Sequence, residues 1–160
     1  MTRAELPAVS DLVFYRGEMV LLDRLLEHDG KSTAARVAAG GRRWLRRADG
    51  SVPPWLVLEY MAQCIAVHEG LLARTEGRPL PRGLLVGVSG LRFQHAHFGA
   101  ESVLRVSASR VGGRPGLGFL SHACRVHAND TGREGALLAE GRLSVAVSLP
   151  CATEAADSKP

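Results

Sequence analysis

The chain has 160 residues, of which 46% are hydrophobic, 22% are charged and 5% are aromatic, and its net charge is +4. This length supports one domain with one core, and the composition is too apolar for an intrinsically disordered protein. The few aromatic residues and the modest basic charge argue against a nucleic-acid interface. We expect one domain over residues 1–149 and a disordered, small and polar tail over residues 150–160.

The N-terminus and the cysteines indicate a cytoplasmic protein. The first residues include Glu5 and Asp11 and lack the apolar core of a signal peptide. The longest apolar stretch is interrupted by Glu59 and Gln63, so we expect no membrane span. The cysteines lie far apart, without a Cys-x-x-Cys pair, which predicts neither a disulfide framework nor a zinc site. They are Cys64, Cys124 and Cys151.

The first half of the chain predicts two short elements and one long helix. Residues 19–27 suit a strand or a short helix, and residues 33–39 suit a strand. A polar loop follows and ends at Pro53-Pro54, a pair that favours a helix start because the first turn needs no backbone N–H. Residues 55–74 lack proline and are apolar on almost every face over three turns, which predicts a core helix.

After this helix the apolar period changes to two, which predicts four strands. The strands cover residues 84–97, 103–111, 117–128 and 136–149. Two turn segments rich in Gly, Pro, Asn and Asp lie between the later strands and favour hairpins. We therefore expect an α+β domain of two strands, one buried helix and a meander of strands. A helix that is apolar on most faces must be wrapped by its sheet or covered by a second subunit.

Glu59 is the most informative residue, because it lies one turn inside the predicted core helix. A carboxylate there loses its water, so it needs a partner or its pKa rises. A carboxylic acid with a raised pKa in an apolar pocket suits general acid–base catalysis. Gln63 lies on the same helix face and can bond to Glu59 or to a substrate, whereas His68 is half a turn out of phase. The alternative is a structural carboxylate at a subunit interface.

Several segments resemble the 3-hydroxyacyl-[acyl-carrier-protein] dehydratases of the hotdog fold. Residues 56–64 (LVLEYMAQC) resemble the central-helix motif of that family. Three further segments resemble its N-terminal motif, its arginine-phenylalanine strand and its last motif: residues 15–24, 87–106 and 139–141. The similarity extends over residues 14–149. The segment Val-Pro-Pro-Trp before LEYMAQ is more similar still to the dehydratase-like proteins of aryl polyene biosynthesis.

This resemblance implies a hotdog fold, in which an antiparallel sheet wraps a long central helix and two protomers form acyl tunnels at their interface. In the family, the helix acid and a histidine of the other protomer remove water from a 3-hydroxyacyl thioester. The resemblance implies Glu59 as the acid and an acyl carrier protein as a partner. It implies no metal or redox cofactor, since the substrate arrives on the phosphopantetheine of acyl carrier protein or of coenzyme A.

Two family residues are absent from this chain. The catalytic histidine of the family stands fourteen residues before the helix acid, and that position is Leu45 here. The family glycine whose N–H polarises the thioester carbonyl falls on Pro54, which has no N–H. Trp55 or Leu56 could donate instead, since the first N–H groups of a helix are unpaired. The predicted substrate-binding set is therefore Pro54, Trp55, Leu56 and Gln63.

His95 and His97 are the candidates for the missing second catalytic group. They alternate with Phe93 on one face of a predicted strand, which in the family ends near the tunnel mouth. The alternative is that both are solvated histidines at a strand end. His122 and His127 are predicted to point to opposite faces of their strand and to be structural.

Three functions remain open at this point. The chain could be a dehydratase with Glu59 and an unusual second group, or a catalytically reduced subunit that completes a hetero-oligomeric dehydratase by pairing with a histidine-bearing homologue. The sequence leaves open whether the chain forms a homodimer or a hetero-oligomer with a related dehydratase subunit. It could also be a hotdog acyl thioesterase or an acyl-binding module. The motif LEYMAQ favours the dehydratase lineage, and the missing histidine favours dependence on a partner. An arginine cluster before the helix is a candidate contact for an acidic carrier protein. It consists of Arg42, Arg43, Arg46 and Arg47.

Overall fold

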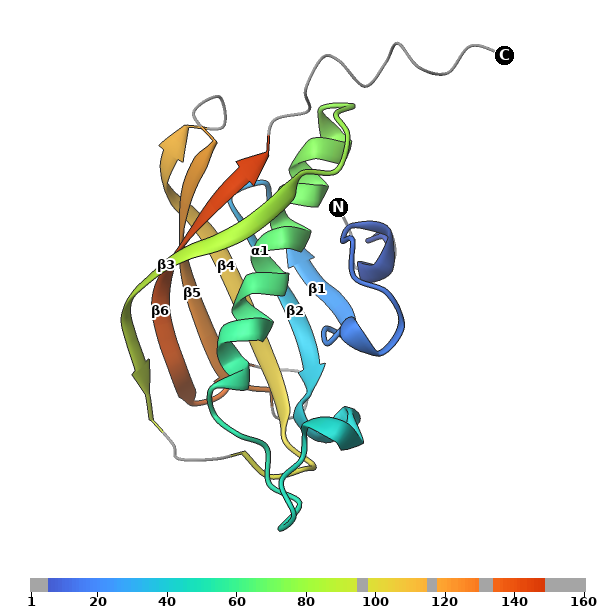
Figure 1. Cartoon of the computed structure of the whole chain (residues 1–160), viewed down its shortest axis with the longest axis vertical. Coiled ribbons are helices and arrows are strands. Elements are labelled where there is room, and N and C mark those ends of the chain that lie inside the picture. Colours follow the sequence, from blue (N-terminus) through green and yellow to red (C-terminus); the bar gives the residue numbers. More distant parts are fainter. Residues whose placement is uncertain (1–5, 95–97, 115–117, 130–133, 149–160) are drawn as a thin grey trace.

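The computed structural model describes residues 6–94, 98–114, 118–129 and 134–148. In these residues one long helix, α1 (Leu56–Thr75), lies along a six-stranded antiparallel sheet (Figure 1). The strands are β1 (Arg24–His28), β2 (Ser32–Ala38), β3 (Arg82–Phe93), β4 (Val103–Arg114), β5 (Phe119–Ala128) and β6 (Leu137–Ser148). The 3-10 segments are η1 (Val9–Asp11), η2 (Gly17–Met19), η3 (Ala39–Gly41) and η4 (Arg43–Leu45).

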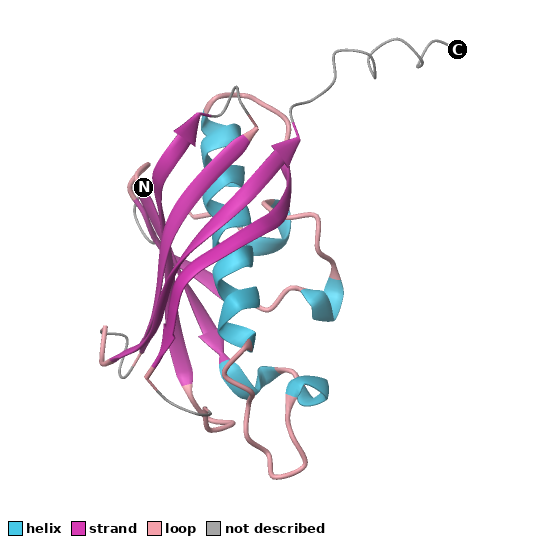
Figure 2. Ribbon diagram, turned by 60° about the vertical axis from the view of Figure 1, so that its left-hand side comes forward, coloured by secondary structure: helices cyan, strands magenta, loops and turns pink. Residues whose placement is uncertain are grey.

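The layers are those of the expected α+β hotdog arrangement. Figure 2 shows the sheet curving along one side of α1, while short helical segments lie on the other side. The core lies between α1 and the concave face of the sheet, because alternate residues of β4 and β5 point toward the helix and are buried. The predicted fold class is therefore confirmed. The predicted boundary at residue 149 and the tail of residues 150–160 lie outside the described residues.

The start of α1 follows from its two prolines. The carbonyls of Pro53 and Pro54 accept hydrogen bonds from the N–H groups of Leu56 (3.2 Å) and Val57 (3.1 Å). The first turn therefore closes although no side chain caps it at Trp55. The helix extends to Thr75, one residue beyond the predicted end.

Helix α1 is long and apolar enough to cross a membrane by length and composition, with a mean hydropathy of 1.2. This differs from the expectation that Glu59 and Gln63 would exclude such a segment. In the fold, however, 72% of that stretch is buried inside the protein. Core helices of soluble proteins pass the same test, and the packing of α1 on its own sheet accounts for its apolar character.

The strand order β1-β2-β4-β5-β6-β3 corrects the predicted meander. Strands β4, β5 and β6 do follow one another, but β3 pairs with β6 and lies at the far edge of the sheet. The alternation of apolar residues identifies a strand without identifying its neighbour, so pairing at long range was not visible in the sequence. The predicted element at residues 19–27 is also divided, since η2 ends at Met19 and β1 begins at Arg24.

Gly70 allows the N-terminal segment to pack closely against α1. A Cβ at this position would lie 2.6 Å from the carbonyl oxygen of Leu12. We expect Gly70→Ala to lower the free energy of unfolding by about 1–3 kcal/mol through this overlap, despite the better helix propensity of alanine. Urea denaturation measures the change. Gly41→Ala is the control, because its Cβ would meet only Ala38 Cβ at 3.6 Å; equal losses in both variants would contradict this expectation.

Candidate functional site

Glu59 and Gln63 lie together on α1, as their spacing predicts. The Gln63 amide nitrogen donates to Glu59 Oε1 (2.9 Å) and to the carbonyl of Met19 (2.8 Å). Its oxygen accepts the backbone N–H of Leu21 (2.9 Å). Gln63 is fully buried, so these bonds connect the Glu59 carboxylate to the N-terminal segment and hold it in one orientation. A contact between Gln63 and substrate stays a prediction.

The Glu59 side chain opens onto a cavity of about 630 Å³ that follows one face of α1. This volume is in the range of small-molecule sites. Glu59 is half-buried in the single chain, so its carboxylate faces the cavity and is less enclosed than the sequence suggested. Apolar side chains form much of the wall. They come from α1, β3, β6 and the N-terminal segment: Leu12, Val13, Phe14, Ala62, Ile65, Ala66, Leu84, Leu85, Val145 and Val147.

Tyr15 shares this cavity with Glu59. Burial, and after it the negative charge of Glu59, raises the pKa of Tyr15 above its ordinary value. The phenol therefore stays protonated at neutral pH and can donate a hydrogen bond beside the carboxylate. Tyr15 was not among the predicted site residues, and the signal that could have identified it is its place at the start of segment 15–24, which resembles the N-terminal motif of the family.

The predicted substrate-binding residues at the start of α1 lie outside the described cavity. The N–H of Leu56 is engaged by the carbonyl of Pro53, and Leu56 is buried. The N–H of Trp55 has no hydrogen-bond acceptor among the residues that the structure describes, and the Trp55 side chain is 60% exposed. Of the two candidate donors, Trp55 is thus the one whose N–H is unpaired within the described part of the chain. Pro54 is half-buried beside it.

The two candidate histidines His95 and His97 lie outside the described residues. The residue that follows them, Phe98, forms an isolated antiparallel bridge with Val52. The two backbone hydrogen bonds of this bridge measure 2.9 and 3.1 Å. The chain therefore passes the segment that leads into α1 directly after His97. A catalytic role of either histidine stays a prediction.

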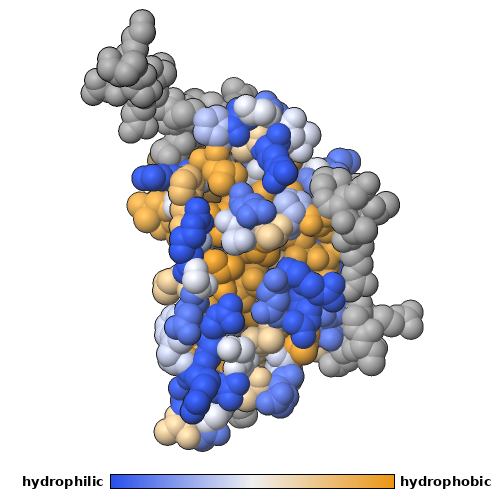
Figure 3. Space-filling model, turned by 90° about the vertical axis from the view of Figure 1, so that its right-hand side faces the viewer, coloured by the Kyte–Doolittle hydropathy of each residue, from blue (hydrophilic) through white to orange (hydrophobic). Residues whose placement is uncertain are grey.

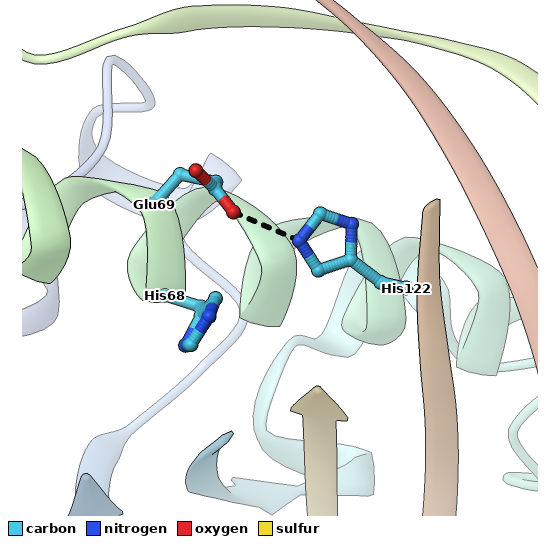
Figure 4. Close-up of side chains that lie close together, drawn as sticks. All are labelled: His68, Glu69 and His122. Carbon is cyan, nitrogen blue, oxygen red and sulfur yellow. Dashed lines mark hydrogen bonds and ion pairs between the residues drawn. The ribbon is translucent and has the colours of Figure 1, made fainter. Parts of the chain in front are cut away.

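A second polar cluster lies in the core, at the helix–sheet interface, and consists of His68, Glu69 and His122 (Figure 4). His122 Nε2 lies 2.9 Å from Glu69 Oε1. Arg110 donates to both carboxylate oxygens of Glu69, through Nε (3.1 Å) and through its terminal nitrogen. Burial raises the pKa of Glu69, but the hydrogen bonds from His122 and Arg110 outweigh it and hold that pKa below its ordinary value.

His68 has a different set of partners. Its Nδ1 lies 2.9 Å from Thr33 Oγ1, and the same oxygen lies 2.8 Å from His28 Nδ1. Burial lowers the pKa of His68 to about 4. These contacts agree with the prediction that His68 is not the partner of Glu59.

His122 and His127 do lie on opposite faces of β5, since His122 faces the helix while His127 lies 3.4 Å from Glu134.

We expect the protein to lose stability as the pH falls from about 6.5 to 4. The pKa of His68 is lower in the folded state than its ordinary value of 6.5, so the unfolded chain binds this proton first. The His68 contribution is complete above pH 6.5, and about 3 kcal/mol is lost by pH 4. Denaturation in urea across this pH range measures the slope, which His68→Gln should flatten. An unchanged slope in that variant would contradict the assignment to His68.

Comparison with known proteins identifies the family. The family model described as ApeP dehydratase (ApeP-like) matches residues 7–155. The chain belongs to the ApeP-like dehydratase family. This match confirms the resemblance to dehydratases. The matched residues include both the Glu59 motif and the N-terminal segment that binds Gln63. No curated protein sequence matches this chain significantly.

Solved structures show the fold of the family and of its wider relatives. The dehydratase heterocomplex ApeI:P from Xenorhabdus doucetiae has a TM-score of 0.79 at 22% identity, over 90% of this chain and 93% of that chain. A mutant thioesterase, PA1618 from Pseudomonas aeruginosa, has a TM-score of 0.58 at 15% identity, covering 78% and 79%. A hypothetical thioesterase from Streptococcus pneumoniae TIGR4, solved with coenzyme A, has a TM-score of 0.59 at 8% identity, covering 78% and 84%. At these identities the likeness shows the hotdog fold.

In this member of the ApeP-like family, the arginine cluster before α1 divides into two parts. Arg42 donates to the carbonyl of Val20 (2.8 Å), and Arg46 donates to the carbonyl of Gly40 (2.8 Å). These two residues therefore brace the loop. Arg43, Arg46 and Arg47 are exposed and are the members of the cluster that a carrier protein could reach, although the Arg46 guanidinium already donates to Gly40. That contact stays a prediction.

Proposed function

We propose that the chain is a dehydratase-like subunit that acts on 3-hydroxyacyl thioesters in fatty-acid- or aryl-polyene-type biosynthesis, with Glu59 as its acid/base. The observation that carries this proposal is Glu59 itself, held by Gln63 and facing an apolar cavity of about 630 Å³. Membership in the ApeP-like dehydratase family supports the reaction class. The cavity suits an acyl chain, because its walls offer apolar contacts along the length of α1.

Dehydration removes a proton from C2 of the acyl chain and hydroxide from C3, giving an enoyl thioester and water. As a carboxylic acid, Glu59 would donate a proton to the leaving C3 hydroxyl, and a second group would accept the C2 proton. The N–H of Trp55 would bind the thioester oxygen as negative charge develops on it. No metal or redox cofactor enters this reaction, and the acyl chain would arrive on phosphopantetheine of acyl carrier protein or of coenzyme A.

We propose that a related dehydratase subunit completes the site. Strand β3 is an edge strand, and an exposed apolar edge is suited to pairing with another chain. Its exposed apolar residues are Leu84, Val86, Val88 and Phe93. Figure 3 also shows apolar surface gathered between hydrophilic groups on one side of the molecule. The heterocomplex ApeI:P shows that a protein of this fold occurs with a second dehydratase subunit. Both partners would work in the cytoplasm.

The partner proposal predicts that Val88→Lys weakens subunit association at least tenfold, because a charge would be buried at the β3 edge. Analytical ultracentrifugation of the chain, alone and mixed with a partner dehydratase, measures the association constant. Phe119→Lys is the matched control, since Phe119 is also exposed but lies on β5, away from the edge. Equal weakening by both substitutions would count against pairing through β3.

Thioester hydrolysis is the second candidate function, because solved thioesterases share this fold. In that reaction Glu59 would activate water for attack on the thioester carbonyl. The two candidates give different products, an enoyl thioester or a free acid and a thiol.

The test is incubation of a 3-hydroxyacyl carrier protein with the purified chain, with and without a dehydratase subunit of the ApeI type. Mass spectrometry follows the loss of water from the acyl group, and a thiol reagent follows hydrolysis. Water loss only in the mixture, above that of the added subunit alone, supports the subunit proposal. Water loss by the chain alone supports an autonomous dehydratase. Thiol release without water loss would contradict both dehydratase proposals and identify a thioesterase. The absence of any product in every mixture would overturn the proposed function.

A further inference from the structure

We propose that His68, Glu69 and His122 form a binding site for a divalent transition-metal ion, and that Zn²⁺ fits this donor set best. One ligand atom from each residue lies within 4.8 Å of the others, and all three residues are buried. Two imidazole nitrogens and one carboxylate oxygen are a donor set that Zn²⁺ uses, with a fourth position left for water. The side chains come together from α1 and β5 (Figure 4), so spacing along the chain does not reveal the set.

His68 has the surroundings of a metal-binding histidine. When its Nδ1–H donates to Thr33 Oγ1 (2.9 Å), the Thr33 hydroxyl can donate in turn to His28 Nδ1 (2.8 Å). The Nε2 atom of His68 then carries a lone pair. It is buried and has no hydrogen-bond partner within the described part of the chain. Histidine ligands commonly hold their other nitrogen by such a bond, which fixes the tautomer and the ring orientation.

Glu69 and His122 need little movement to accept an ion. Ligands about 2.0–2.1 Å from a tetrahedral Zn²⁺ lie about 3.3 Å from one another. The observed separation of His122 Nε2 and Glu69 Oε1 is 2.9 Å, so these two atoms would part slightly as the ion enters. The ion would replace the proton that His122 Nε2 shares with Glu69, and that proton would move to Nδ1, which has no hydrogen-bond partner among the described residues, or be released to solvent. The more distant ligand pairs, which lie within 4.8 Å, would close toward the same spacing through small shifts of the Glu69 and His122 side chains, while the bond to Thr33 keeps the His68 ring in place.

Arg110 determines how tightly the ion is held. It donates to both oxygens of Glu69, and in the metal-bound site it would keep its bond to Oε2 while Oε1 binds the ion. Carboxylate ligands commonly have such a hydrogen-bonding partner. The positive charge of Arg110 opposes a cation, however, so removing this charge should strengthen metal binding. A purely structural ion pair predicts no such gain.

The ion would reach the cluster through the cavity, because Glu69 is one of its lining residues. Glu59 lies ten residues earlier on α1, about 15 Å away along the helix axis. The proposed ion is therefore remote from the proposed reaction and would stabilise the contact between α1 and β5. This inference does not depend on the dehydratase activity.

Binding is tested on the full chain after treatment with a chelator and dialysis. Titration of Zn²⁺ against a chromophoric competitor at neutral pH should show one ion per chain, and Co²⁺ should give the visible absorption of a tetrahedral site. His68→Gln and His122→Gln should weaken binding at least tenfold, and Thr33→Val should weaken it about 10–100-fold. His127→Gln is the matched control, because His127 lies on the other face of β5 beside Glu134. Arg110→Met should bind Zn²⁺ more tightly than the wild type.

Circular dichroism separates loss of a ligand from loss of the fold, and the Co²⁺ spectrum of the wild type requires no variant at all. The proposal is overturned by a wild-type chain that binds no stoichiometric Zn²⁺. It is equally overturned by His127→Gln reducing the affinity as much as His68→Gln does, or by Arg110→Met weakening the site while remaining folded.

Discussion

Replacing Glu59 by glutamine is expected to lower the rate of dehydration by a factor of about 10²–10⁴, the usual contribution of a positioned acid–base group. Glutamine has nearly the same shape, and its side-chain oxygen can still accept the hydrogen bond from the Gln63 amide, which measures 2.9 Å in the wild type. The contact to the N-terminal segment should therefore survive. An amide cannot exchange the proton that the reaction requires, so the loss should appear in kcat, with KM little changed.

The measurement is steady-state turnover of a 3-hydroxyacyl carrier protein by whichever assembly proves active, the chain alone or the mixture. Glu76→Gln is the matched control, because Glu76 lies at the exposed end of the same helix and pairs only with Arg78 at 2.5 Å among the described residues. That variant should retain wild-type turnover. Full activity in Glu59→Gln would show that this carboxylate is structural, as the sequence alternative allowed.

The second large effect is expected from Glu69→Leu, which should lower the free energy of unfolding by about 3–5 kcal/mol. The substitution leaves the Arg110 guanidinium, which is 25% exposed, without its carboxylate partner. It also removes the acceptor of the His122 hydrogen bond, at 2.9 Å in a fully buried position. An uncompensated buried charge is costly, whereas apolar groups of similar volume can replace a whole ion pair at little cost.

Chemical denaturation in the presence of a chelator measures this effect without any contribution from bound metal. The double variant Glu69→Leu/Arg110→Met should recover a large part of the loss. Glu27→Leu is the control, because Glu27 also pairs with an arginine, Arg105 at 2.6 Å, but is itself well exposed. That loss should not exceed about 1 kcal/mol. Similar losses for Glu69→Leu and Glu27→Leu would show that burial adds nothing to the Glu69 ion pair.

The sequence predicted the features that depend on neighbours along the chain. The helix, its start after Pro53-Pro54 and the alignment of Glu59 with Gln63 follow from local sterics and from the helical period, and all are present. Strand β3 at the sheet edge was not predictable in this way. Its pairing with β6 is set by contacts with residues 46 to 66 positions away along the chain, from Phe93 with Ala139 to Arg82 with Ser148, and alternation carries no information about such partners.

The buried histidine cluster was missed for a related reason. His122 stands at an inward position of β5, between the buried residues Leu120 and Cys124, so the strand period alone marks it as a polar residue in the core. Such a residue requires a partner. The partner, Glu69, comes from a helix 53 residues earlier, and only the fold brings the two together. A search for polar residues at inward positions of both elements would have identified the pair.

The cavity beside Glu59 has one wall outside the sheet and the helix. Residues 12–15 form this wall. One of the contacts that hold them in place is a cation–π contact, in which the Arg82 guanidinium lies 4.8 Å from the centre of the Phe14 ring. None of these wall residues takes part in a strand. Insertions or substitutions there can lengthen, shorten or widen the cavity without disturbing the strand pairing of the sheet. Under the proposed function, such changes would alter the preferred acyl chain while the fold and the position of Glu59 stay the same.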